Sequence, residues 1–402
     1  MTDFIGGSVN NKKLVLTMIL LGAFTVAANS YASEGNGIEY TGSGFATLGI
    51  SKMLGGTRAN VMDYNCPCFI SDYAQAGVYN GTSRLQWKPD SKLGLQGSAT
   101  YNSISLTAQA VARGATGTAD LEWLYGSYKL NDKITIQAGR KRLPMFYYSD
   151  VQDIGVALPW THLPPGPYGW EAVNYNGVNV RYQDQWSDWS AAANLLAGNE
   201  SNSNSGYWKI YNGRQSQSNI KWSNIIGGDL TLSKDWLETR AVYIQSDTQE
   251  NYASAIWNGL TYVPQAAGPI YPRAKQQIFG LTVNVDHQNW LLRTEFNQIN
   301  HPGLSYRDHA QLVGVGYHYG KWQPMATWSE YRGTVVTEPT APASYPNMQQ
   351  TISLTLRYDL TTSSDLKIQY DNQTDHSSPG YQATGYDYGN SRLLTFSYDL
   401  VF

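Results

Sequence analysis

The chain has 402 residues and a formal net charge of −3, with 13% aromatic and only 15% charged residues. Typical soluble domains carry about 25% charged residues, and the near-neutral balance leaves no basic surface for nucleic acid. A mean hydropathy of −0.40 would suit a soluble secreted protein. Strands of a membrane barrel escape this measure, however, because every second residue faces a polar lumen. Composition therefore leaves a soluble secreted protein and a membrane β-barrel as candidates.

The N-terminus has the three parts of a secretory signal peptide. Two lysines precede the apolar run 14–28, and Ser30 and Ala32 are small residues spaced for cleavage after Ala32. A membrane anchor helix is the alternative, but about 15 apolar residues are short for a span of roughly 20. We expect residues 1–32 to be a cleaved signal peptide and residues 33–402 to form one barrel domain.

The remaining chain alternates with a period of two from end to end, and no stretch of any length follows a helical period. In chain order, strands are expected at 38–50, 93–101, 104–113, 121–130, 134–141, 176–183, 188–196, 225–233, 236–246, 275–286, 289–300, 308–319, 322–332, 349–360, 365–375 and 392–402. Seven pairs are joined by very short turns, long connections separate the pairs, and one strand stands alone at each end. This pattern predicts about 16 strands, with 14 or 18 as alternatives, and is typical of a bacterial outer-membrane barrel.

The alternation gives each strand one apolar and one polar face. In one strand Ile352, Leu354 and Leu356 share a face, and Ser353 and Thr355 share the other. In a soluble sandwich the apolar face would cover a core, whereas in a wide barrel the polar face lines an aqueous lumen and the apolar face meets lipid. The alternation fits both folds. The signal peptide and the turn pattern favour the barrel, so we predict an all-β, transmembrane antiparallel β-barrel.

The last strand supports the barrel as well. One of its faces consists of Leu394, Phe396, Tyr398, Leu400 and Phe402, and the chain stops on that Phe. In a soluble sheet this strand would be an exposed apolar edge, but a closed barrel pairs it on both sides. We assign membrane insertion, through the barrel-assembly machinery, to this strand.

The third long connection follows three consecutive basic residues and contains five prolines, which forbid a regular strand. It reads AGRKRLPMFYYSDVQDIGVALPW over 138–160 and THLPPGPYGW over 161–170. A short helical turn is expected over Ser149–Ile154, with Ser149 as its cap. A loop of this kind either stands outside the barrel or folds into the bore.

The Gly-rich first strand, the AGR-to-LPW stretch and the Phe-terminated last strand resemble the Gram-negative outer-membrane porins, and in particular an incompletely characterised proteobacterial porin group. The resemblance implies a general-porin-like barrel of 16 strands in which the third loop folds inward and forms a constriction. It also implies a possible homotrimer, for which the Ala-rich face of Ala108, Ala110 and Ala112 could serve.

In that family, acids of the third loop face bases on the barrel wall. If this carries over, the loop acids are Asp150 and Asp153. The candidate wall bases are Arg113, Arg140, Lys141, Arg142, Arg181, Arg240, Arg293 and Arg357. The alternative for each arginine is a lumen charge neutralised by a neighbour, such as Arg293 by Glu295. Because the loop lacks a strong acidic motif, its field is expected to be weaker or more favourable to anions.

Other candidate sites are few. Cys66 and Cys68 are expected to form a disulfide that stiffens an exported loop, since a lone CxC lacks the further ligands of a zinc site. The six histidines are scattered, and no hydrolase, phosphate-binding or dinucleotide-binding motif occurs. We therefore expect no metal, no cofactor and no enzymatic activity. Trp236, Trp290, Trp322 and Tyr398 fit an interfacial belt better than a sugar-stacking slide.

The expected function is passive diffusion of small hydrophilic solutes and ions through a water-filled channel of the outer membrane. The expected partners are outer-membrane lipid and lipopolysaccharide, the assembly machinery, and the permeating solutes. A channel selective for a sugar, a dicarboxylate or phosphate is the nearest alternative. An outer-membrane lipase or protease would need a nucleophile beside a base, and no spacing marks such a pair. A structural barrel that holds a partner protein is the third alternative.

Overall fold

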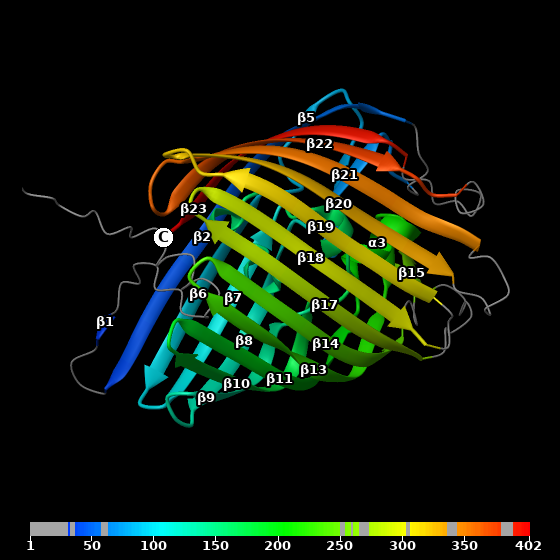
Figure 1. Cartoon of the computed structure of the whole chain (residues 1–402). Coiled ribbons are helices and arrows are strands. Elements are labelled where there is room, and N and C mark those ends of the chain that lie inside the picture. Colours follow the sequence, from blue (N-terminus) through cyan, green and yellow to red (C-terminus); the bar gives the residue numbers. More distant parts are fainter. Residues whose placement is uncertain are drawn as a thin grey trace, which may run out of the picture.

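The computed structural model describes residues 31–32, 37–57, 63–249, 254–258, 260–264, 273–302, 306–335, 344–378 and 389–402. They form a closed antiparallel β-barrel of 16 strands (Figure 1). In order round the wall these are β2 (Ile38–Gly56), β6 (Lys92–Tyr101), β7 (Ile104–Arg113), β8 (Thr118–Lys129), β9 (Ile134–Arg142), β10 (Asn174–Trp186), β11 (Trp189–Asn202), β13 (Ile220–Lys234), β14 (Leu237–Gln249), β17 (Ala274–His287), β18 (Trp290–His301), β19 (Tyr306–Tyr317), β20 (Trp322–Val335), β21 (Ser344–Asp359), β22 (Ser364–Asp375) and β23 (Ser391–Val401). Each overlaps one strand predicted from the sequence, so the predicted fold class and strand count are confirmed.

The barrel closes where its last strand meets its first. β23 pairs with β2, with Val401 opposite Phe45. The chain end adds a reciprocal pair of backbone hydrogen bonds between Phe402 and Gly44, at 2.9 and 2.6 Å. The Phe402 ring lies over Gly44, where a Cβ would come within 2.5 Å of the ring. The terminal strand is therefore paired on both sides, as a closed barrel requires.

The connections differ between the two ends of the barrel. Turns of two to four residues join the strands at one end, and most connections at the other end are long. Two short strands extend the sheet: β1 (Tyr31–Ala32) and β5 (Leu85–Gln86), which both pair with β2. The expected signal peptide, apart from these first two residues of β1, lies outside the described residues. None of the helices in the described ranges is long and apolar enough to span a membrane.

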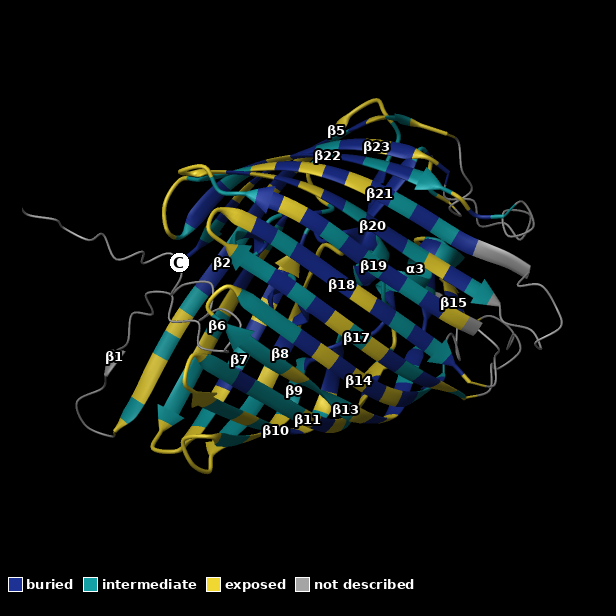
Figure 2. Ribbon diagram, viewed as in Figure 1, coloured by how far each residue is buried: buried dark blue, intermediate teal, exposed yellow. Residues whose placement is uncertain are grey.

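The outer face of the wall is apolar. On β21, Ile352 and Leu354 are 51% and 53% exposed, whereas Ser353 between them is 1% exposed and faces inward. Figure 2 shows the same alternation of buried and exposed residues along the barrel strands. Apolar side chains exposed all round a closed barrel are stable in hydrocarbon and not in water. Closure of the barrel also gives the backbone N–H and C=O groups of the wall their hydrogen-bond partners. The fold and its outer face therefore place the wall of the barrel in a membrane.

Large aromatic side chains mark the end with the short turns. Trp290 and Trp322 are the first residues of β18 and β20, Trp236 is the last residue of the turn before β14, and all three are exposed. The Tyr358 ring contacts Trp322, with ring centroids 4.5 Å apart and the ring planes tilted by 52°. Amphipathic rings in this position are typical of a membrane–water interface.

A glycine in β9 is required by the backbone. Gly139 has a φ of +138°, and a Cβ there would lie 2.2 Å from the carbonyl oxygen of Leu124 on β8. We expect Gly139→Ala to lower the free energy of unfolding by about 1–3 kcal/mol, because both the backbone and the new contact are strained. Gly97→Ala is the matched control, since the nearest atom to its Cβ, the carbonyl oxygen of Thr41, is 3.9 Å away. Urea unfolding in lipid vesicles measures both, and equal midpoints would refute this account.

Loops fill part of the interior. Loop L1 (57–91, described from 63) contains β3 (Cys68–Asp72) and β4 (Gly77–Asn80), and Cys66 is disulfide-bonded to Cys68. Loop L4 (203–219) contains α3 (Gly206–Asn212) and β12 (Ser216–Ser218), and β12 pairs with β15 (Ser254–Trp257), which pairs with β16 (Tyr262–Pro264). Ile210 of α3 packs into the apolar cluster of L1. L1 and L4 thus share a small core near the mouth.

One part of the lumen wall is dry. Inward-facing Leu196, Val242, Ile244 and Ile278 form an apolar cluster with Met145 of the third long loop. The sequence led us to expect a polar inward face on the strands in general. These positions are apolar because the third loop covers them, so they line a packed core and not the water path.

Candidate channel constriction

The third long loop, L3 (residues 143–173), runs inside the barrel, as the resemblance to porins implied. It contains two 3₁₀ turns, η1 (Ser149–Val151) and η2 (Gly155–Ala157), and the short helix α2 (Pro165–Tyr168). The Trp160 indole donates to Thr327 on β20 at 2.9 Å, and the Thr161 amide donates to Gln369 on β22 at 3.0 Å. L3 therefore crosses from β9 to the far wall. Figure 1 shows its green segments within the barrel.

The predicted cap of the helical turn is wrong in detail. Tyr148, not Ser149, stands at the position before η1, and no side chain caps this turn. The Ser149 hydroxyl instead accepts a hydrogen bond from the Phe146 amide at 3.0 Å. A tight loop folded on itself offers Ser149 a local partner that the linear pattern did not show.

The loop acid Asp153 is buried among basic side chains where strands β6 to β9 meet the long loops. It accepts hydrogen bonds from Arg113 (Nη2–Oδ2 2.7 Å) and Arg142, and the Lys92 ammonium lies 3.7 Å away. Glu122 pairs with the same two arginines. Burial opposes the charged form of Asp153, but the two arginines outweigh it and hold its pKa well below the usual range. Asp120, 3.5 Å from Arg113, brings the cluster to three acids and three bases, so its charges balance.

Basic side chains of the far wall hold L3 by its backbone. Arg240 on β14, Arg357 on β21 and Lys367 on β22 each donate hydrogen bonds to L3 carbonyl groups. The accepting residues are Pro144 and Phe146 for Arg240, Val156 and Leu158 for Arg357, and Gly155 for Lys367, at 2.8–3.1 Å. The irregular backbone of a buried loop leaves carbonyls that need donors. These bases therefore anchor the loop and are largely withdrawn from water.

Two more of the predicted bases are paired on the wall. Arg293 donates to Asp286 at 3.0 Å and not to Glu295, the neighbour expected from the sequence. Glu295 instead accepts the backbone amide of Tyr147 in L3 at 3.0 Å. Arg140 makes a two-pronged pair with Glu200, at 2.9 and 3.1 Å.

His162 links L3 to L1 and to the far wall. Its imidazole lies 3.0 Å from Asp90 of L1 and 3.3 Å from Asp371 of β22, and all three are buried. Burial disfavours the charged imidazolium, but the carboxylates of Asp90 and Asp371 outweigh it and raise the pKa of His162 to about 10. The sequence suggested only a scattered surface or lumen histidine. The structure assigns it to a buried ion triad.

We expect the stability contributed by His162 to depend on pH. The folded pKa of about 10 exceeds the ordinary value of about 6.5, so the contribution is complete below pH ~6.5 and is lost as the pH rises through about 10. His162→Gln should therefore lower the free energy of unfolding by about 3–5 kcal/mol at pH ~6, and by much less at pH ~10.5. Urea unfolding at both pH values measures this, with His287→Gln, at the exposed last residue of β17, as the control. A deficit independent of pH would contradict the charged triad.

Charged side chains accessible to water lie between L3 and strands β9 and β10. Arg181 faces inward from β10 and is partly exposed, and Asp150 of L3 is exposed. Neither forms a hydrogen bond or ion pair with another described residue. Lys141, partly exposed on β9, donates to Gln137 and interacts electrostatically with Asp150 and Arg181. These three are the predicted site residues that the structure brings together with polar groups open to the interior of the barrel.

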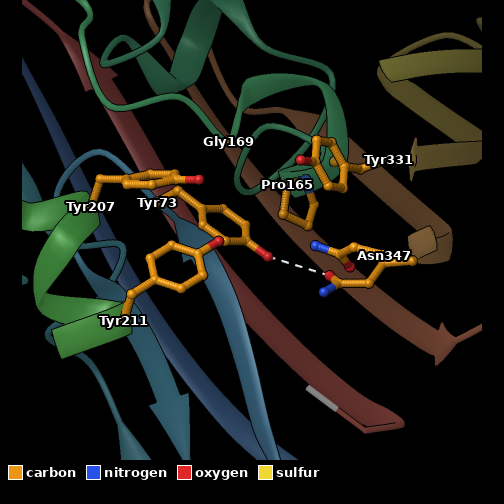
Figure 3. Close-up of a pocket in the computed structure, with 9 residues that line it drawn as sticks. Tyr73, Pro165, Gly169, Tyr207, Tyr211, Tyr331 and Asn347 are labelled. Carbon is orange, nitrogen blue, oxygen red and sulfur yellow. Dashed lines mark hydrogen bonds between the residues drawn. The ribbon is translucent and has the colours of Figure 1, made fainter. Parts of the chain in front are cut away.

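The three loops also meet in a tyrosine-lined joint near the mouth (Figure 3). Tyr73 of L1 donates to Gln349 of β21 at 3.3 Å. The cavity beside this bond has a volume of about 10 Å³, room for about one water molecule. Its other labelled lining residues are Pro165, Gly169, Tyr207, Tyr211, Tyr331 and Asn347. This is a packing joint between L1, L3 and L4 and is too small for a sugar ring.

Three of the residues that shape the site were missed in the sequence. Lys367, Lys92 and Glu122 do not belong to the third loop or to the predicted bases. The signal for Lys367 was its strand phase: it alternates with Asp365 and Gln369 on the inward face of β22. A lysine beside an inward acid indicates a buried ion cluster. The residues near Lys367 in the sequence do not indicate which loop covers it. Within the described ranges, no group of His, Cys, Asp and Glu side chains could hold a metal ion.

A closed 16-strand barrel with an apolar outer face and a loop folded into its bore is the fold of the outer-membrane porins. The chain resembles the outer membrane channel DcaP of Acinetobacter baumannii, with a TM-score of 0.54 and 12% identity over 92% of this chain and 99% of that chain. It resembles OmpT of Vibrio cholerae with a TM-score of 0.53 and 9% identity, over 93% and 100% of the two chains. The anion-selective porin from Comamonas acidovorans gives a TM-score of 0.52 and 13% identity, over 91% and 100%. No protein-family model and no curated protein matches the sequence.

Proposed function

We propose that the chain is an outer-membrane channel for passive diffusion of small hydrophilic solutes and ions. The observation that carries this is the charged, partly exposed strip between L3 and strands β9 and β10. Elsewhere L3 is packed on the wall, but at Asp150, Arg181 and Lys141 polar groups remain accessible to water. In the bore of a barrel, groups of this kind line an aqueous passage and screen solutes by size and charge.

We infer further that these three residues form the constriction. Among the predicted candidates, Arg113, Arg142 and Asp153 are balanced within their buried cluster by Glu122 and Asp120. Arg140 and Arg293 pair with acids, and Arg240 and Arg357 bind loop carbonyls. Two cations and one acid therefore remain beside the passage. This balance favours anions, although weakly, because a single acid faces the two bases. The likeness to an anion-selective porin is in the fold alone and adds no weight to this sign.

Purified protein in a planar lipid bilayer tests the proposal. Stepwise increases in conductance are expected, and a salt gradient should give a reversal potential with the sign of anion preference. A tight seal from protein that shows the heat-modifiable migration of a folded barrel would refute an open pore. Saturable block of the current by a sugar, a dicarboxylate or phosphate would favour the substrate-selective alternative over general diffusion.

We also propose a homotrimer and a cleaved leader. One of the similar structures is a trimer form of Vibrio cholerae OmpT, and the outward side chains of Ala108, Ala110 and Ala112 give β7 a flat face suited to close packing. Cleavage after Ala32 would free the domain 33–402. N-terminal sequencing of protein from outer membranes tests the cleavage, and its mass in mild detergent tests the trimer.

A further inference from the structure

The lipid-facing wall carries a groove over strands β18 to β21, which are yellow to orange at the front of Figure 1. The groove has a volume of about 290 Å³. Its outward lining residues are Trp290, Val315, Tyr317, Pro324, Ala326 and Leu354. Each of them belongs to a membrane-spanning strand, so the groove lies within the wall and not on a loop.

The hollow arises from a difference in side-chain size. Pro324 and Ala326 are short and lie on one strand, with larger side chains on the strands to either side. Trp290 and Tyr317 form one bank, with ring centroids 5.0 Å apart and the rings nearly perpendicular. Leu354 on β21, which is 53% exposed, forms the other bank. The Trp–Tyr contact fixes the shape of the groove without help from a ligand.

One end of the groove lies at the short-turn end of the wall. Trp290 is the first residue of β18, and Lys321 lies in the turn just before β20. Lys321 is exposed, and its ammonium donates to the Leu360 carbonyl at 3.1 Å and lies 5.8 Å from the centre of the Tyr358 ring. A lysine at this depth keeps its charge at the level of the lipid headgroups.

We propose that this groove binds one acyl chain of a phospholipid whose anionic headgroup contacts Lys321. In a bilayer the occupant of an outward groove is hydrocarbon, and leaving lipid for protein brings no hydrophobic gain. Preference for a bound chain must come from dispersion contacts in a concave surface and from the charge of the headgroup. Both are available here, on one continuous strip of wall.

A second copy of the chain fits the groove less well. Counted round the wall, β19 lies on the far side of the barrel from β7, the strand of the flat small-residue face. A trimer built on β7 would leave the groove facing lipid. A concave, aromatic-banked surface also suits a flexible chain better than another rigid wall.

The test uses the full barrel, reconstituted with phosphatidylglycerol or phosphatidylcholine and studied by native mass spectrometry. Ala326→Phe fills the groove and should lower retention of both lipids about tenfold, equivalent to about 1.4 kcal/mol. Ala241→Phe, at an exposed position on β14 away from the groove, is the matched control and should retain lipid normally. Lys321→Gln should lower retention of phosphatidylglycerol about fivefold, close to the effect of one basic side chain at a membrane surface, and leave phosphatidylcholine unchanged.

Equal retention in Ala326→Phe and Ala241→Phe would overturn the proposal, and so would loss of oligomers without loss of lipid in Ala326→Phe. A measurement on the unaltered protein guards against misfolded variants. Phospholipid with brominated chains should quench a fluorescence component that Trp290→Phe lacks, and no such component would also overturn it. Channel conductance should be unchanged in the groove variants, so this test is independent of the proposed function.

Discussion

Replacement of Lys367 by methionine is expected to free L3 from the far wall and to lower the free energy of unfolding by about 3–5 kcal/mol. The Lys367 ammonium donates to the Gly155 carbonyl of L3 and to Asp399 of β23, each at 2.8 Å, and lies 3.0 Å from Asp365. Its side chain and both carboxylates are fully buried. Methionine matches the length of the lysine stem but leaves the buried carboxylate of Asp399 without a counter-charge, whereas Asp365 keeps Arg357 at 3.0 Å. Water must enter to solvate Asp399.

Two measurements check this result. The urea midpoint in lipid vesicles should fall, and single channels should show additional open levels, because L3 would no longer have one fixed position. Lys129→Met is the matched control, since Lys129 is 57% exposed in its side chain and pairs only with an exposed Asp132. Adding Asp399→Asn to Lys367→Met should recover part of the lost stability by removing the stranded charge. A Lys367→Met channel with normal stability and a single open level would show that Lys367 does not hold the loop.

Reversal of one charge, Arg181→Glu, is expected to change the ion preference of the channel from anions to cations. In the constriction proposed above, the three charges are Arg181, Lys141 and Asp150, so the substitution takes their sum from +1 to −1. Two charge units about 5 Å from a permeating ion change its energy by ~1.7 kcal/mol even at the dielectric constant of water. That corresponds to a change of roughly 16-fold in the permeability of an ion of one sign, and the permeability of the opposite sign changes in the other direction.

The reversal potential in a salt gradient measures this preference directly. Its sign should invert in Arg181→Glu, and the shift should shrink at high salt because the charges are screened. Lys129→Glu makes the same charge change on the exposed short-turn side and should leave the sign as it is. If Arg240→Glu alone inverted the sign, the constriction would lie against the far wall and not beside β9 and β10.

Sequence periodicity was enough to predict the wall. A strand that meets lipid on one face and the lumen on the other must alternate in polarity, and this constraint acts on residues two apart. The sequence alone therefore predicts that Ile352 and Ser353 point to opposite faces of the wall, and neighbouring strands need not be known. The apolar face of the last strand, which ends on Phe402, likewise predicted that this strand is paired on both sides. The number of strands and the short turns follow from the same local rule.

The interior was decided by tertiary structure. The sequence placed acids in L3 and bases on inward faces, but it could not say which of them would meet. Lys367 and Gly155 are 212 residues apart and meet only because the barrel is closed. Arg181 and Arg357 both lie at positions whose side chains point into the barrel. Arg181 is partly exposed, whereas Arg357 donates hydrogen bonds to carbonyl groups of L3. Which of these two roles an inward base takes depends on the path of a loop from another part of the chain, and no local pattern encodes that path.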